Sequence, residues 1–182
     1  MKKIMIVDDN YLSAEGIEKN IDWETLNAEI IHVCYNGTSA IEAMKKEPAD
    51  LIISDIEMPD LDGISMSRQA LEINPMVKII LISAYDKFEY ARRALLLGAL
   101  DYIEKPLDYS YLIQKVKNAF ALMEKEQKNL QLLKQSRPLL TEKFFREITH
   151  LPSSEAAYRL KPYLQYLNLE LNYDFYTVVV LE

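Results

Sequence analysis

Four short apolar runs in this sequence end at or next to side chains that could carry out chemistry. Two runs end in carboxylates, one in a hydroxyl and one near an ammonium group: Asp8 with Asp9, then Asp55, Ser83 and Lys105. Carboxylates brought close together repel each other unless a cation lies among them, and Mg²⁺ prefers such hard oxygen ligands. A nucleophilic carboxylate, a magnesium site, a hydroxyl donor and a lysine together suit phosphoryl transfer, with the cation, Ser83 and Lys105 holding the phosphoryl oxygens.

Asp55 is the acid around which the other groups are arranged. It follows Leu51-Ile52-Ile53-Ser54 and precedes a loop stiffened by Pro59. An unbroken apolar run bounded by turn residues is typical of a central parallel strand buried on both faces. Ligands bind at the carboxyl ends of such strands, although a single aspartate there could instead only cap the next turn. The acids, hydroxyl and lysine at the ends of the other runs favour the chemical interpretation.

Strand-like and helix-like segments alternate through residues 1 to 108. We expect strands near 4–7, 29–34, 51–54, 78–82 and 100–103, and helices near 12–21, 38–47, 64–73, 88–97 and from 108. This alternation predicts an α/β fold, a five-stranded parallel, doubly wound sheet with right-handed crossovers. In the flavodoxin-like order 2-1-3-4-5 the first and third strands are neighbours at the topological switch point, which would bring Asp8, Asp9 and Asp55 together.

Local signals set the expected helix ends in this region. Thr38 is predicted to cap the second helix and Pro48 to stop it. Asn74-Pro75 should end the third helix, and Gly98 the fourth, because glycine readily adopts the left-handed conformation of a helix terminator.

A long helical run follows Asp108 and is predicted to reach about Gln135, with Pro138 ending it. Its apolar positions are spaced alternately by four and three, with Glu126 as the weak member: Leu112, Val116, Ala119, Met123, Glu126, Leu130 and Leu133. The early positions should pack on the sheet. The later ones could form a dimeric coiled coil or dock on a second domain, and the pattern leaves both open.

The predicted domains are residues 1–124, a helical linker and possible coiled coil at 125–137, and the start of a second domain at 138–182. This last part reads as an incomplete α+β segment. Its strand signal from Asp174 runs to the last residue, so we expect the sequence to be part of a longer chain.

Charge is distributed unevenly along the chain, whose net charge is -7. Residues 1–108 hold 11 Lys and Arg against 20 Asp and Glu, whereas residues 109–182 hold 10 against 8. An acidic domain repels nucleic-acid backbones, and a divalent cation is its more natural partner.

Composition also bears on the compartment. No apolar run approaches the length of a membrane span, and the single Cys34 cannot form an internal disulfide, so we expect a cytoplasmic protein with no membrane partner. Cys34 is expected to be a small buried hydrophobe, and His32 and His150 lack the spacing of metal ligands.

The motifs at the strand ends match one known family in order and spacing over about residues 1 to 124. They resemble the receiver domain of two-component response regulators: Asp8-Asp9, Asp55 with Met58-Pro59 and Gly63, Ser83-Ala84, and Tyr102 before Lys105-Pro106.

That resemblance implies a role for each group. Asp8, Asp9, Asp55 and the backbone carbonyl of Glu57 would bind Mg²⁺. Asp55 would accept a phosphoryl group from a sensor histidine kinase, and Ser83 and Lys105 would sense it. Tyr102 would swing inward as Ser83 moves, and the Lys105–Pro106 bond would be cis. Phosphorylation is expected to switch the surface and promote homodimerisation.

A narrower resemblance concerns the stretch from Ser83 to Ala91 with Gly98 to Tyr102. It is similar to regulators whose full-length members carry a carboxyl-terminal AraC-type helix-turn-helix domain. Control of transcription is therefore implied for a full-length parent, with DNA bound only by a domain that this sequence does not contain.

Two other functions fit part of the pattern. A Mg²⁺-dependent phosphohydrolase also uses an aspartate after a strand, but it usually has a second aspartate two residues later, where this sequence has Glu57. A pseudo-receiver would serve only as an interaction module. On the stronger resemblance we expect no enzyme beyond catalysis of the protein's own phosphorylation and dephosphorylation.

Overall fold

The computed structural model describes residues 1–84 and 101–148, with only the helical backbone at 133–148. The chain divides into two compact units, Met1–Leu122 and Met123–Glu182. The elements run in this order: β1 Lys2–Val7, α1 Tyr11–Asn20, β2 Ala28–Cys34, α2 Gly37–Lys46, β3 Leu51–Asp55, α3 Gly63–Ile73, β4 Lys78–Ser83, β5 Asp101–Glu104 and α5 Tyr109–Ile148. The predicted fourth helix, the predicted terminal strand and His150 lie outside the described residues.

The five strands form one sheet in the order β2-β1-β3-β4-β5, and all four neighbouring pairs are parallel. The predicted flavodoxin-like order is therefore confirmed. β3 lies between β1 and β4, and every one of its residues is buried. This position explains its unbroken apolar sequence, because a central parallel strand has no face in water.

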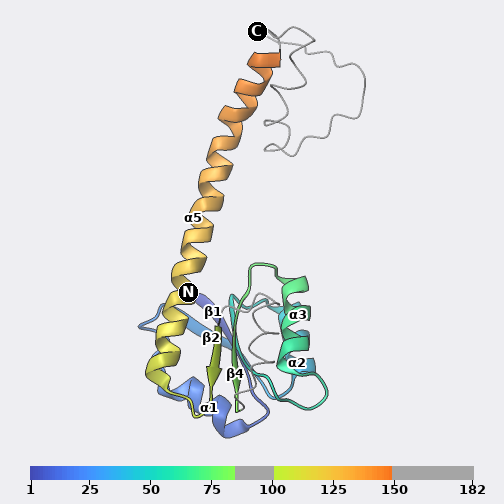
Figure 1. Ribbon diagram of the computed structural model, residues 1–182, viewed down its shortest axis with the longest axis vertical. Coiled ribbons are helices and arrows are strands. Elements are labelled where there is room, and N and C mark those ends of the chain that lie inside the picture. Colours follow the sequence, from blue (N-terminus) through green and yellow to red (C-terminus); the bar gives the residue numbers. More distant parts are fainter. Residues whose placement is uncertain (85–100, 149–182) are drawn as a thin grey trace. The chain divides into compact units, whose positions relative to one another are not determined.

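Helices cover both faces of the sheet (Figure 1). α2 and α3 bury one apolar cluster with the strands, which includes Met44, Ile52 and Met66. On the other side lie α1 and the first turns of α5, where Leu112, Val116 and Ala119 are fully buried. The early positions of the long helical repeat thus belong to the core of the first unit, as predicted.

The start of α2 differs from the prediction. Its N-cap is Asn36, whose side-chain oxygen accepts a hydrogen bond from the Ser39 amide at 2.8 Å. The prediction that Thr38 caps this helix is wrong, because Asn36 is already extended and reaches the free amides of the first turn. The other ends agree with the sequence: α2 stops before Pro48, and α3 stops at Asn74.

The start of α5 is capped by Asp108, whose Oδ1 accepts from the amides of Ser110 at 2.8 Å and Tyr111 at 3.3 Å. The prediction that Pro138 ends this helix is wrong, because α5 continues to Ile148. Proline inside a helix removes one backbone donor and costs about 3 kcal/mol, but good helix formers on both sides can outweigh that cost. The sequence around Pro138 is rich in Leu, Lys, Gln and Glu.

The prediction for Cys34 can be checked in the first unit. Cys34 is buried at the end of β2, as expected for a small hydrophobe, and burial raises the pKa of its thiol. The ring of His32 lies 3.1 Å from the Glu47 carbonyl oxygen through Nε2. Among the described residues, no helix is both long enough and apolar enough to cross a membrane.

Candidate functional site

Three carboxylates meet at the carboxyl-terminal edge of the sheet. Asp55 is the last residue of β3, and Asp8 and Asp9 follow β1, its parallel neighbour. One oxygen from each of the three lies within 4.8 Å of the others. Asp8 and Asp55 are buried, whereas Asp9 is exposed. A set of hard oxygen donors that is closed on one side and open to water on the other fits Mg²⁺, which usually keeps several of its waters.

Lys105 connects two of these acids. Its Nζ lies 3.0 Å from Asp8 Oδ2 and 2.7 Å from Asp55 Oδ2. The residue directly follows β5, and its peptide bond to Pro106 is cis, as the family resemblance implied. Its backbone amide donates to the Ser83 carbonyl at 2.8 Å, which fixes the end of β5 against the end of β4.

Within residues 1–84 and 101–132, negative charges outnumber positive ones at this cluster. Burial raises the pKa of Asp8, although hydrogen bonds from the Asn10 amide and Lys105 oppose that rise. Burial lowers the pKa of Lys105, but its hydrogen bonds to Asp55 and Asp8 and their negative charges outweigh this, so the net shift is upward. Among the described residues, one ammonium pairs with two of the three clustered carboxylates, and a divalent cation would supply further positive charge.

The side chain of Asp55 is held at both oxygens. Oδ2 faces Lys105, and Oδ1 accepts from the Glu57 amide at 3.2 Å. The loop that carries Glu57 is itself fixed, because the Gly63 amide donates to the Ile56 carbonyl at 2.9 Å. The predicted metal-binding carbonyl of Glu57 therefore belongs to a loop tied closely to Asp55.

Ser83 and Tyr102 lie on the two strands beyond β3. Ser83 is fully buried at the end of β4, one residue after Ile82, which pairs with Asp55. Tyr102 in β5 pairs with Leu81 in β4. Its half-buried side chain packs against the core cluster on the α2 and α3 face. The sheet therefore brings the Ser83 backbone to the same edge as Asp55 and Lys105, and it places Tyr102 on the adjacent strand.

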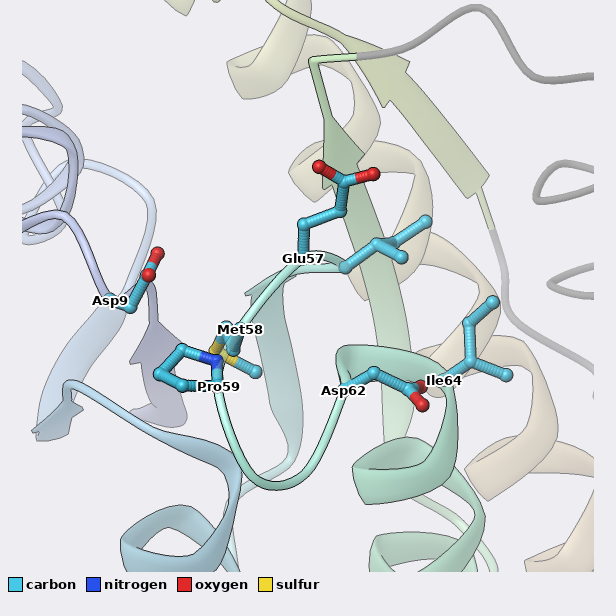
Figure 2. A pocket seen from close by; sticks show the side chains of 7 residues that line it. Asp9, Glu57, Met58, Pro59, Asp62 and Ile64 are labelled. Atoms are coloured by element: carbon cyan, nitrogen blue, oxygen red, sulfur yellow. The ribbon is translucent and has the colours of Figure 1, made fainter.

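Two pockets adjoin the acids. One, of about 410 Å³, lies between Asp9 and the loop after β3; Figure 2 shows its lining of Asp9, Glu57, Met58, Pro59, Asp62 and Ile64. The other, of about 330 Å³, is lined by Asp8 and Lys105 together with residues of α1 and the start of α5. Asp9 thus lines one pocket and Asp8 lines the other.

Sequence reasoning missed one residue of this site. The amide of Asn10 donates to Asp8 Oδ1 at 2.9 Å, and the Asn10 side chain caps α1 by accepting from Leu12 and Ser13. Aspartate side chains often accept from the amide two residues later in a turn, and asparagine is a common helix cap. The Asp8-Asp9-Asn10 triplet could therefore have predicted both hydrogen bonds.

The geometry and the sequence motifs agree on one class of protein. The response regulator receiver domain family matches residues 4–117, so the chain belongs to this family. Receiver domains are signalling modules of two-component systems that bind Mg²⁺ at an acidic pocket and interact with histidine kinases.

Named relatives show how much of a regulator this chain represents. It is 29% identical over 126 residues to the transcriptional regulatory protein YesN of Bacillus subtilis, covering 69% of this chain and 34% of that protein. The chain therefore spans about a third of YesN. Among solved structures it is similar to the receiver domain of AraT, a response regulator of Geobacillus stearothermophilus, with 34% identity and a TM-score of 0.66. That match covers 69% of this chain and 98% of the AraT chain.

A second solved structure is the two-component transcriptional regulator AraC from Clostridium phytofermentans, with 31% identity and a TM-score of 0.63. It covers 71% of this chain and 99% of the other. All three relatives match a segment about the size of the first unit.

Proposed function

We propose that Asp55 is the phospho-acceptor of this receiver domain and takes a phosphoryl group from a sensor histidine kinase in a Mg²⁺-dependent reaction. The observation that carries this proposal is the position of Lys105. Its Nζ bridges Asp8 and Asp55, which are two of the three clustered carboxylates. The positive charge of this lysine points at the carboxylate of Asp55, so it is placed to hold an oxygen of a phosphoryl group on that residue.

Asp8, Asp9, Asp55 and the Glu57 carbonyl would hold the ion, and bound Mg²⁺ would neutralise charge on the phosphoryl oxygens during transfer. A carboxylate oxygen of Asp55 attacks phosphorus while the bond from phosphorus to the kinase imidazole nitrogen breaks. The bonding electron pair leaves with the imidazole nitrogen. Lys105 and the hydroxyl of Ser83 would then hold oxygens of the new acyl phosphate, and the exposed side of the site admits the donor.

The proposed output follows from the neighbouring strands. If Ser83 moves towards a phosphorylated Asp55, Tyr102 on β5 can follow into the vacated space and change the surface around that strand. Self-association would then change, with α5 carrying the effect along the chain. The proposed receiver spans residues 1–124, with a linker at 125–137 and a further domain from 138.

The place of this switch in the cell is also a proposal. Its relatives are transcriptional regulators by name, so control of transcription by a longer cytoplasmic parent is the output we infer. DNA would be bound by a further domain of that parent and not by the receiver, because residues 1–108 hold 11 basic against 20 acidic side chains.

Acetyl phosphate offers a direct test, since a receiver can take its phosphoryl group without a kinase. We expect the intact mass to rise by one phosphoryl group in the presence of Mg²⁺, and the rise to disappear on chelation and in Asp55→Asn. Rapid turnover of varied phosphate esters would instead support a phosphohydrolase. A chain that stays unmodified with both acetyl phosphate and a phosphorylated kinase domain would be a pseudo-receiver.

A further inference from the structure

The backbone carbonyl of Asp55 accepts a hydrogen bond from a side chain of its own strand. The hydroxyl of Ser54, the preceding residue, donates to this oxygen at 2.8 Å and is fully buried. Successive side chains of a strand point to opposite faces, so Ser54 lies on the face away from the Asp55 carboxylate. Its partners across the sheet are Val7 in β1 and Leu81 in β4, both members of the apolar cluster. A hydroxyl is thus placed in an apolar layer directly behind the acceptor.

The peptide unit between Asp55 and Ile56 is held at both of its polar ends. Its oxygen accepts from the Ser54 hydroxyl, and its amide donates to the Ile82 carbonyl at 2.9 Å. Gly63 closes the same place from α3, because a methyl group added there would lie 2.1 Å from the Asp55 carbonyl oxygen. A side chain at residue 63 would therefore push on the oxygen that Ser54 holds.

We propose that Ser54 is a positioning residue for phosphoryl transfer, acting through the Asp55 peptide plane; the inference rests on the function proposed above. This plane joins Asp55 to Ile56, so its orientation sets where the loop that follows starts relative to the Asp55 carboxylate. It also sets the position of the Glu57 amide on Asp55 Oδ1 and of the Glu57 carbonyl, a proposed metal ligand. Loss of the hydroxyl would let the acceptor and the metal site rotate together.

A purely structural role for Ser54 makes a different prediction. Its surroundings are apolar, and a β-branched apolar residue suits a buried central strand better than serine does. If the hydroxyl served stability, an apolar residue of similar shape would mainly change the unfolding midpoint. If it positions Asp55, the same replacement slows transfer in a protein that still folds cooperatively.

The test compares Ser54→Val with Ser54→Thr, which have nearly the same volume and differ in the hydroxyl. A misplacement of about 1 Å can cost about 10²-fold in rate, and we expect a smaller shift to slow acetyl phosphate transfer about tenfold in the Val variant. The Thr variant should stay within about twofold of the wild type. Calorimetric titration with Mg²⁺, without any phosphodonor, should show weaker binding in the Val variant only.

Ser67→Ala is the matched control, because its hydroxyl is also fully buried and donates to a carbonyl, that of Gly63 at 2.6 Å. It should leave the transfer rate and Mg²⁺ binding near those of the wild type. Gly63→Ala presses on the Asp55 carbonyl by an independent route and should slow transfer as Ser54→Val does. Both variants are first checked for a cooperative unfolding transition.

The outcomes separate the two levels of the proposal. Equal transfer rates and equal Mg²⁺ affinities in the Val and Thr variants, with a wild type that is phosphorylated, would overturn the role of Ser54 alone. An equal loss in Ser67→Ala would overturn it as well, since any buried hydroxyl would then have the same effect. A wild type that takes up no phosphoryl group would overturn the proposed function and this inference with it.

Discussion

Lysine and carboxylate groups gather at both ends of the parallel sheet, and the two gatherings differ in burial and in charge balance. At the amino-terminal end, Lys3 pairs with Glu47 at 2.8 Å, and both side chains are more than 40% exposed. At the carboxyl-terminal end, Lys105 pairs with Asp8 and Asp55, whose side chains are 1% and 9% exposed. Similar chemical groups thus form a solvated surface pair at one end and a largely buried cluster of three carboxylates and one lysine at the other.

Asp50 and Asp55 show the same contrast between a structural and a chemical role. Asp50 directly precedes β3, and Asp55 is the last residue of that strand. Asp50 accepts from the Lys3 amide at 2.9 Å and so ties β3 to β1. Asp55 meets two further carboxylates and one ammonium. The comparison teaches that a site for chemistry arises where the described negative charges outnumber their positive partners, because binding a cation there relieves the excess and the bound cation can then balance an incoming phosphoryl group.

The largest expected effect on phosphorylation comes from replacing Asp55, with Asp50 as the comparison. Asp55→Asn should abolish phosphorylation by acetyl phosphate, because the nucleophilic carboxylate is lost. Asp50→Asn should leave phosphorylation near the wild-type level and affect mainly stability. Intact mass spectrometry over a time course measures both variants. A phosphoryl group on Asp55→Asn in the same yield as on the wild type would remove Asp55 from its proposed role.

Loss of each lysine gives the next effect. Lys105→Ala should slow transfer by about 10²-fold, the usual cost of removing one charge-stabilising group from a reacting centre. Lys3→Ala should leave the rate unchanged, since its partner is a solvated carboxylate at the opposite edge. Initial rates with acetyl phosphate and Mg²⁺ compare the pair. Similar rates in both variants would mean that Lys105 contributes no more than a surface lysine.

Magnesium should distinguish the two ends without any phosphoryl chemistry. We expect the unfolding midpoint of the wild type to rise as the Mg²⁺ concentration is raised, because Mg²⁺ binds the folded protein. Asp9→Asn should reduce that rise. Asp9 is exposed, so its replacement should do little to the metal-free protein. Glu47→Gln is the control at the other end and should keep the full response. An unchanged magnesium response in Asp9→Asn would contradict a site at the acidic cluster.

The smallest effect concerns pH and the Lys3–Glu47 pair. The hydrogen bond and the positive charge of Lys3 lower the pKa of Glu47 below its usual value. A carboxyl whose pKa is lowered by folding adds stability above its unfolded pKa, and this is lost as pH falls through the folded pKa. Because both groups are solvated, Glu47→Gln should change the unfolding midpoint only slightly, with the difference shrinking below about pH 4. A constant difference across that range would exclude the ion pair as its cause.

Much of the fold could be predicted from local patterns. The apolar runs that stop at Asp8, Asp55 and Ser83 mark buried strands, and the alternation with helical segments implies a parallel sheet. Parallel strands share one carboxyl edge, so the meeting of the acids followed from strand order alone. Helix ends were harder, because Asn36 and Thr38 are both good caps and only the backbone conformation selects between them.

The sequence by itself determined which chemical groups stand at the ends of the strands and, through their spacing, the family to which the chain belongs. The tertiary structure decided how those groups face each other: Lys105 bridges two acids that lie 97 and 50 residues away in the chain. It also turned the hydroxyl of Ser54 onto the Asp55 carbonyl and let α5 pass through Pro138. The physical reason is that residue type and periodicity report burial, whereas the direction of a polar side chain depends on partners that folding brings from elsewhere in the chain.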